Sequence, residues 1–152
     1  MEKIASFQVN HNVLTPGIYL SRTDDDIVTY DIRLKMPNGS SFLENAAMHT
    51  IEHLFATMAR NSAFQKQIIY FGPMGCRTGF YFLVRNMNHA DAIAMIQSIF
   101  AQIAEFEGEV PGRTAIECGN YLEHDLEGAK EEAKNFLPVI QSWSAEQLVY
   151  PS

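Results

Sequence analysis

The 152-residue sequence contains only two cysteines, Cys76 and Cys118, and no long apolar run. A transmembrane helix needs roughly 20 consecutive apolar residues, and no stretch approaches that length. The first residues, 1–7, are too few and too polar to contain the apolar region of a signal peptide. We therefore expect a cytoplasmic protein without a membrane partner, in which both thiols stay reduced and free for chemistry or metal binding.

Basic residues are also scarce. The chain has 11 Lys and Arg against 18 Asp and Glu, which gives a net charge of −7. Such a surface repels a phosphate backbone, so nucleic acid is not an expected partner. No internal repeat, low-complexity tract or linker divides the sequence, and its length fits a single domain over 1–152.

The pattern of apolar residues predicts three strands and three helices. Alternation predicts a strand with one buried face over 27–36, in which Thr29, Asp31, Arg33 and Lys35 form the polar side. The other expected strands cover 67–71 and 78–85. The expected helices run from a capping box at 41–44 to about Asn61, over 88–106, and from an N-cap at Asp125 to just before Pro138. This order favours an α+β fold, with an antiparallel sheet and helices packed on one face.

The first expected helix carries the segment His49-Thr50-Ile51-Glu52-His53. At about 100° per residue, His53 lies about 40° and Glu52 about 60° from His49 around the helix axis. The opposite side of this helix is apolar, so one face belongs to the core and the other presents two imidazoles and a carboxylate. Two histidines at i and i+4 can bind one metal ion, with the glutamate placed to move protons beside it.

The spacing leaves the third metal ligand open. Cys118 is the strongest candidate, because a thiolate binds a divalent first-row metal more strongly than an exposed carboxylate does. His124 is a weaker candidate, since a lone histidine near a helix start usually lies on the surface. The acidic candidates are Glu117, Glu123, Glu127 and Glu131. Three protein ligands would leave a fourth coordination position open, as a catalytic metal requires.

The second cysteine, Cys76, lies in Pro73-Met74-Gly75-Cys76-Arg77-Thr78-Gly79, at the turn between two expected strands. Glycines let the backbone approach a ligand closely, and an adjacent cation favours a thiolate. Such a thiol could act as an acid or a base near neutral pH. A buried, inert cysteine under a tight turn is the alternative. Spacing alone assigns no role to Ser6, His11 or Arg33.

Together these blocks resemble the S-ribosylhomocysteinase (LuxS) family over nearly the whole chain. The matching segments, in order, are Ser6-Phe7, His11-Asn12, Tyr30-Asp31-Ile32-Arg33, His49-Thr50-Ile51-Glu52-His53-Leu54, Pro73-Met74-Gly75-Cys76-Arg77-Thr78-Gly79-Phe80-Tyr81 and Cys118-Gly119. The chain departs from the family at Tyr70-Phe71-Gly72, where the family often has Asp-Ile-Ser.

The resemblance implies a lyase that cleaves S-ribosylhomocysteine to homocysteine and 4,5-dihydroxy-2,3-pentanedione, the precursor of autoinducer-2. That activity would serve the activated methyl cycle and quorum sensing. The resemblance also implies one divalent metal per subunit, ferrous iron (Fe2+) with zinc (Zn2+) as a substitute, and a homodimer with both active sites at the subunit interface.

The resemblance further implies a role for each matching residue. The residues that would hold the metal are His49, His53 and Cys118. The acid/base pair would be Glu52 and Cys76. The residues that would contact the substrate are Ser6, His11 and Arg33, from the partner subunit, and Arg60, near the homocysteine end.

Two other functions fit parts of the pattern. His-x-x-Glu-His is also the signature of inverted zinc peptidases, in which Glu52 would activate water. The short chain leaves no room for the two-domain body expected of such a peptidase. A non-catalytic module with a structural metal would need a closed set of four ligands, and the sequence shows no evident fourth.

Overall fold

The computed structural model describes residues 1–152. Its strands are β1 (Gly17–Asp24), β2 (Ile27–Arg33), β3 (Ile68–Pro73) and β4 (Gly79–Arg85). They form one antiparallel sheet in the order β1-β2-β4-β3. The helices are α1 (Ala5–Gln8), α2 (Asn45–Arg60), α3 (His89–Ala104) and α4 (Leu126–Ile140), with the short 3-10 helices η1 (Gln65–Gln67) and η2 (Ala145–Leu148).

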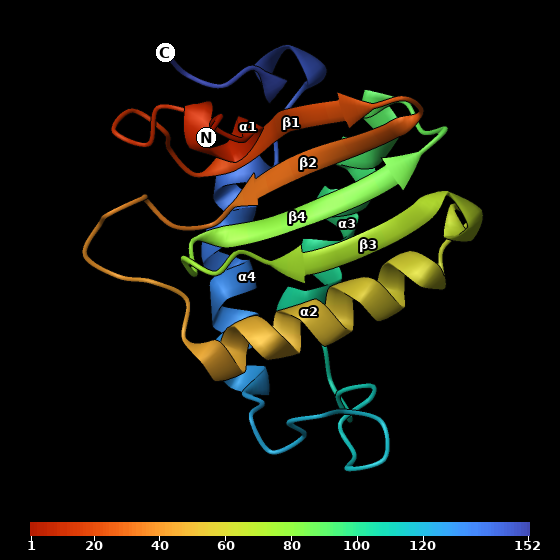
Figure 1. Ribbon diagram of the computed structural model, residues 1–152. Helices are drawn as coiled ribbons and strands as arrows, with labels where there is room; N and C mark the ends of the chain where they lie inside the picture. The colour runs from red at the N-terminus through yellow and green to blue at the C-terminus, as the bar shows by residue number, and fades with distance from the viewer.

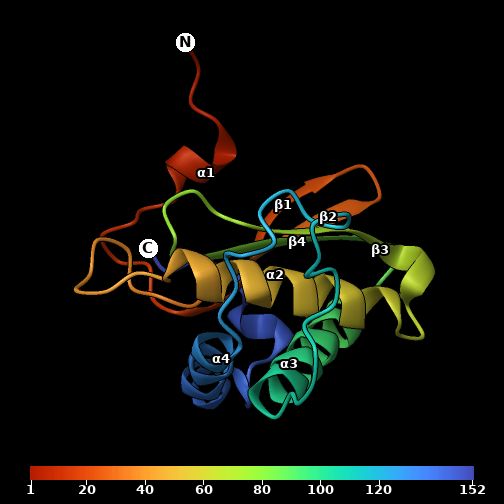
Figure 2. The same ribbon diagram turned by 90° about the horizontal axis from the view of Figure 1, so that it is seen from below.

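The three long helices lie on one face of the sheet, and the N-terminal segment with α1 lies on the other (Figures 1 and 2). This arrangement confirms the predicted α+β fold, with an antiparallel sheet and helices packed on one face. None of the helices combines the length and the apolar character needed to cross a lipid bilayer.

A single core of 28 buried residues joins the sheet to the helices. Phe55 of α2 stacks on Phe71 of β3 with ring centroids 3.9 Å apart, and Phe100 of α3 meets Phe136 of α4 at 5.0 Å. Ile51 is also fully buried, so the predicted apolar side of α2 faces this core. Packing of this side turns the histidine side of α2 away from the sheet.

The prediction of one buried face for β2 is wrong. Tyr30 and Ile32 enter the core as expected, but Asp31 and Arg33 on the other side are only 0% and 2% exposed. Arg33 donates a hydrogen bond of 2.6 Å to Asp31, and Tyr150 covers the same carboxylate. Long-range contacts therefore bury a side that the local alternation of residues marks as solvent-facing.

Helix boundaries differ from the prediction at two places. The capping box expected at 41–44 does not form, and Glu44 is the N-cap of α2 without a side-chain cap. Leu43 is instead fully buried, and its backbone N–H donates to the carbonyl of Arg77 at 2.9 Å. At the other end of the chain, α4 continues through Pro138 to Ile140, whose side chain is fully buried in the core.

Candidate active site

Four metal-binding side chains converge beside α2: His49, His53, Cys118 and His124, whose donor atoms lie within 4.8 Å of one another. The two histidines on α2 are one turn apart, and Cys118 comes from the loop that leads to α4. The sulfur of Cys118 lies 3.5 Å from Nε2 of His49 and 3.9 Å from Nε2 of His53. The structure thus brings together the three predicted metal ligands.

Backbone carbonyls fix the orientation of both imidazoles on α2. Nδ1–H of His49 donates to the carbonyl of Glu123, and Nδ1–H of His53 donates to the carbonyl of Pro111, each at 2.8 Å. A carbonyl only accepts, so the proton must be on Nδ1 and the lone pair on Nε2. Both lone pairs therefore face the Cys118 sulfur, which is the arrangement that a bound divalent metal requires. Two imidazoles and a thiolate suit iron or zinc.

His124 does not lie on the surface, and the prediction that it would is wrong. Its side chain is 9% exposed, and its ring stacks on that of His49 with centroids 4.0 Å apart. Burial, together with the neighbouring His49 and His53, lowers the pKa of His124 to about 4, so the ring is neutral. The sequence offered one indication that His124 lies near the site. It stands immediately before the N-cap Asp125, at the end of the loop that carries Cys118.

Hydrogen bonds around Thr50 indicate which nitrogen of His124 carries the proton. Thr50 Oγ1 accepts from the backbone N–H of Asp125 at 2.9 Å and lies 2.9 Å from Nδ1 of His124. Donation of the hydroxyl proton to Nδ1 satisfies both groups and leaves the proton on Nε2. Nε2 is buried without a hydrogen-bond partner. In this tautomer the Nε2 atom of His124 presents a proton, not a lone pair, to the other three side chains of the cluster.

Glu52 and Arg60 lie beside the predicted metal ligands. They share with His53 an open pocket of about 430 Å³ that also reaches Tyr70 and Phe71 on β3. Arg60 donates a hydrogen bond of 2.9 Å to the carbonyl of Ile69, which holds its guanidinium against the edge of the sheet. This pocket offers a carboxylate next to the metal ligands and a cation at its far end.

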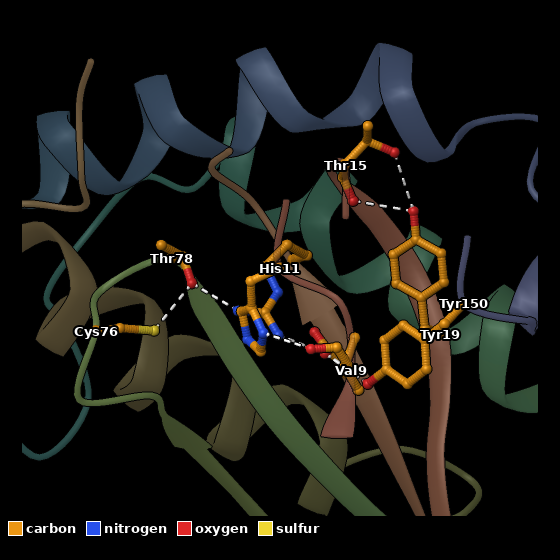
Figure 3. Close-up of polar contacts among 9 residues, drawn as sticks. Val9, His11, Thr15, Tyr19, Cys76, Thr78 and Tyr150 are labelled. Carbon is orange, nitrogen blue, oxygen red and sulfur yellow. Dashed lines mark hydrogen bonds and ion pairs between the residues drawn. The ribbon is translucent and has the colours of Figure 1, made fainter. Parts of the chain in front are cut away.

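Cys76 lies in a different pocket of about 430 Å³, on the face of the sheet that carries α1. The other predicted site residues in that pocket are Ser6, His11 and Arg33. Nδ1–H of His11 donates to the carbonyl of Val9 at 2.9 Å (Figure 3). Cys76 is exposed and thus not the inert core cysteine considered as an alternative.

The predicted site residues of one chain therefore form two groups. His49, His53, Cys118, Glu52 and Arg60 surround α2. The second group, Ser6, His11, Arg33 and Cys76, lines the pocket on the other side of the sheet. Glu52 and Cys76 line two different pockets of the chain.

Known proteins match this chain over nearly all of its length. A family model described as S-ribosylhomocysteinase (LuxS) matches residues 4–147. An S-ribosylhomocysteine lyase of Borreliella afzelii is 46% identical over 99% of this chain and 100% of its own. Proteins of the same name from Desulfotalea psychrophila and Clostridium acetobutylicum are 46% and 45% identical, covering 100% and 99% of this chain and 100% and 99% of their own.

Proposed function

Because the chain belongs to the S-ribosylhomocysteinase (LuxS) family, we propose that it is an S-ribosylhomocysteine lyase. It releases homocysteine and 4,5-dihydroxy-2,3-pentanedione, and so supplies the autoinducer-2 precursor. The observation that carries this proposal is the pair of imidazoles directed at the Cys118 sulfur, with Glu52 beside them. The metallopeptidase interpretation has no support, since the similarity over residues 4–147 is to the lyase family.

His49, His53 and Cys118 hold one divalent metal in this proposal, ferrous iron in the active form and zinc as a substitute. These residues fit a divalent metal because two Nε2 lone pairs are free and the Cys118 sulfur lies close to both. When bound by these residues, such an ion would supply Lewis-acid chemistry for the sugar carbonyl. Cytoplasmic conditions suit both thiols, because they keep the Cys118 ligand and the acid/base residue Cys76 reduced.

Glu52 and Cys76 move the protons in the proposed reaction. The sugar carbonyl must migrate along the carbon chain, so hydrogen leaves one carbon and returns to the next without net redox change. A base then removes a carbon-bound proton, the C–S bond breaks, and the sulfur of homocysteine leaves and takes up a proton. Two acid/base groups on different sides of the sugar can serve these transfers in turn.

A homodimer would bring the two groups of residues together. Glu52 and Cys76 line different pockets within one chain, which supports a site shared between subunits. In this assembly Cys76 enters with Ser6, His11 and Arg33, and meets the metal ligands and Glu52 of the other subunit. A two-fold symmetric dimer forms two such sites.

The direct test supplies purified protein with S-ribosylhomocysteine. We expect release of homocysteine, followed as a new free thiol, and of a dicarbonyl that a diamine traps, without nucleotide, flavin or reductant. In deuterated water the product should acquire deuterium at carbon, because the migrating hydrogens pass through solvent-exchangeable groups. Cleavage of peptides by a metal-loaded dimer that released no thiol would overturn the proposal.

A further inference from the structure

A row of polar side chains crosses the face of the sheet opposite the long helices. Asp31 of β2 pairs across the sheet with Tyr19 of β1 and Tyr81 of β4. The next row contains Arg33, whose neighbours on both strands are glycines, Gly17 and Gly79. The guanidinium of Arg33 lies between Asp31 and Thr78, at the Cys76 pocket.

Four polar contacts connect the end of the chain to Cys76. The hydroxyl of Tyr150 donates to Oδ2 of Asp31 at 2.7 Å, and Nη2 of Arg33 donates to the same oxygen at 2.6 Å. Nη1 of Arg33 donates to Oγ1 of Thr78 at 2.7 Å, and that oxygen lies 3.0 Å from Sγ of Cys76. Figure 3 shows Thr78 beside Cys76, and Tyr150 beside Tyr19.

The direction of these contacts leaves a hydroxyl donor facing the Cys76 sulfur. Thr78 Oγ1 accepts from Arg33, so its own hydroxyl proton remains free to be donated to Cys76. Hydrogen bonds to a charged group favour the charged form, and the nearby guanidinium adds to the effect. The contact chain thus ends at the reactive thiol of the second pocket.

Tyr150 and Arg33 share one oxygen of the Asp31 carboxylate. Oδ1 of Asp31 is buried without a hydrogen-bond partner. Oδ2 therefore accepts both hydrogen bonds that this carboxylate receives. Burial and the negative charge of Asp31 raise the pKa of Tyr150, so its hydroxyl stays protonated and donates. Other titratable groups on this face are Tyr19, which stacks on Tyr150, Tyr81, whose pKa is raised mainly by burial, and His11 in the Cys76 pocket.

We propose that Tyr150 is a positioning residue for Cys76, acting through the hydrogen-bonded chain Tyr150–Asp31–Arg33–Thr78. It donates a proton to Asp31, so that the carboxylate holds the guanidinium in place without fully compensating its charge. The relevance of this chain of contacts to catalysis rests on the proposed role of Cys76 in the lyase reaction. The contacts themselves and the reactivity of the thiol do not depend on that role.

Alkylation of Cys76 by iodoacetamide tests this inference in the metal-loaded dimer, with the modified peptide quantified by mass spectrometry from pH 5 to 9. In Tyr150→Phe we expect the alkylation profile to move to higher pH by roughly half a unit, which is about a threefold loss of rate on its rising limb. Asp31→Asn should move the profile the opposite way, because Arg33 keeps its charge and loses its counter-ion.

Tyr19→Phe is the matched control. Its hydroxyl donates to the carbonyl of Thr15 and makes no contact with Asp31, while its ring stacks on Tyr150 with centroids 5.1 Å apart. This control should alkylate as the wild type does. A Tyr150→Phe protein with a lower Tm but an unchanged alkylation profile would overturn the inference. A shifted alkylation profile with an unchanged pH dependence of lyase turnover would support the contact chain and remove Cys76 from the proposed mechanism.

Discussion

At the scale of single residues, backbone carbonyls orient the two imidazoles of α2, so that their Nε2 lone pairs point into the site. His49 and His53 each place a proton on Nδ1 because a carbonyl oxygen lies there. The carbonyls belong to Glu123 and Pro111, in the same loop that supplies Cys118. The loop therefore provides one ligand and orients the other two.

Metal content tests the ligand set. His49→Ala, His53→Ala and Cys118→Ala should each give folded protein with little bound metal, because three donors share one ion. His124→Ala should retain about one metal ion per chain, since its Nε2 carries a proton and cannot ligate. Elemental analysis after gel filtration measures both outcomes. Equal metal loss in the His124 variant would make it a fourth ligand, and a fully loaded Cys118 variant would refute the set.

At the scale of elements, β2 has contacts on both faces of the sheet. Its core side carries Tyr30, whose hydroxyl lies 2.6 Å from Nδ1 of His89 at the start of α3. Its other side carries Asp31 and Arg33, which reach the Cys76 pocket. One strand thus contributes to the packing of a helix and to the surroundings of a reactive thiol.

Replacement of Tyr30 by Phe tests this contact. At pH 7 the variant should lose about 1 kcal/mol of unfolding free energy, the typical net value of one hydrogen bond. Burial raises the pKa of Tyr30 from 10.0 to about 12, so between these values the unfolded chain releases a proton that the folded protein keeps. Between pH 10 and 12, ionisation of Tyr30 in the unfolded chain therefore lowers the free energy of unfolding of the wild type by about 1.4 kcal/mol per pH unit. The variant has no tyrosine at this position and does not show this decrease.

Urea unfolding at pH 7 and between pH 10 and 12 measures the difference between the two proteins. The gap should narrow as the pH rises above 10. A gap that stayed constant over this range would show that Tyr30 ionises equally in the folded and unfolded states.

At the scale of the whole molecule, the two groups of site residues predict which inactive subunits complement each other. Mixed Cys76→Ala and Glu52→Gln subunits should recover about a quarter of wild-type activity, since half of random dimers are mixed and each has one intact site. A mixture of Arg33→Ala and Glu52→Gln subunits should recover the same fraction of wild-type activity. Cys76→Ala mixed with Arg33→Ala should recover nothing, because both changes fall in the same contributed pocket.

Lyase turnover after confirmed subunit exchange is the measurement. Each variant alone should lose about 10²–10⁴-fold in turnover if the group moves protons. Both acid/base variants should keep their metal, since neither residue lies among the clustered donors. Recovery from the Cys76 and Arg33 mixture would mean that these residues serve different sites.

The sequence by itself determined the fold class, the histidine side of α2 and the N-cap at Asp125, whose side chain accepts from the backbone of Gly128. Each of these depends on residues within one or two turns of the chain, where helical spacing and capping chemistry act. The choice of Cys118 rested on the strength of thiolate ligation, and the structure places its sulfur beside both imidazoles.

Only the tertiary structure decided the features that depend on distant segments. It extended residues 41–44 against Arg77 instead of capping α2 there, and it buried His124 against His49. It also buried Asp31 and Arg33, because Tyr150 near the end of the chain and Thr78 in the turn before β4 contact them. Local patterning describes the average environment of a residue type, whereas burial and hydrogen-bond partners depend on which remote segments the chain brings together.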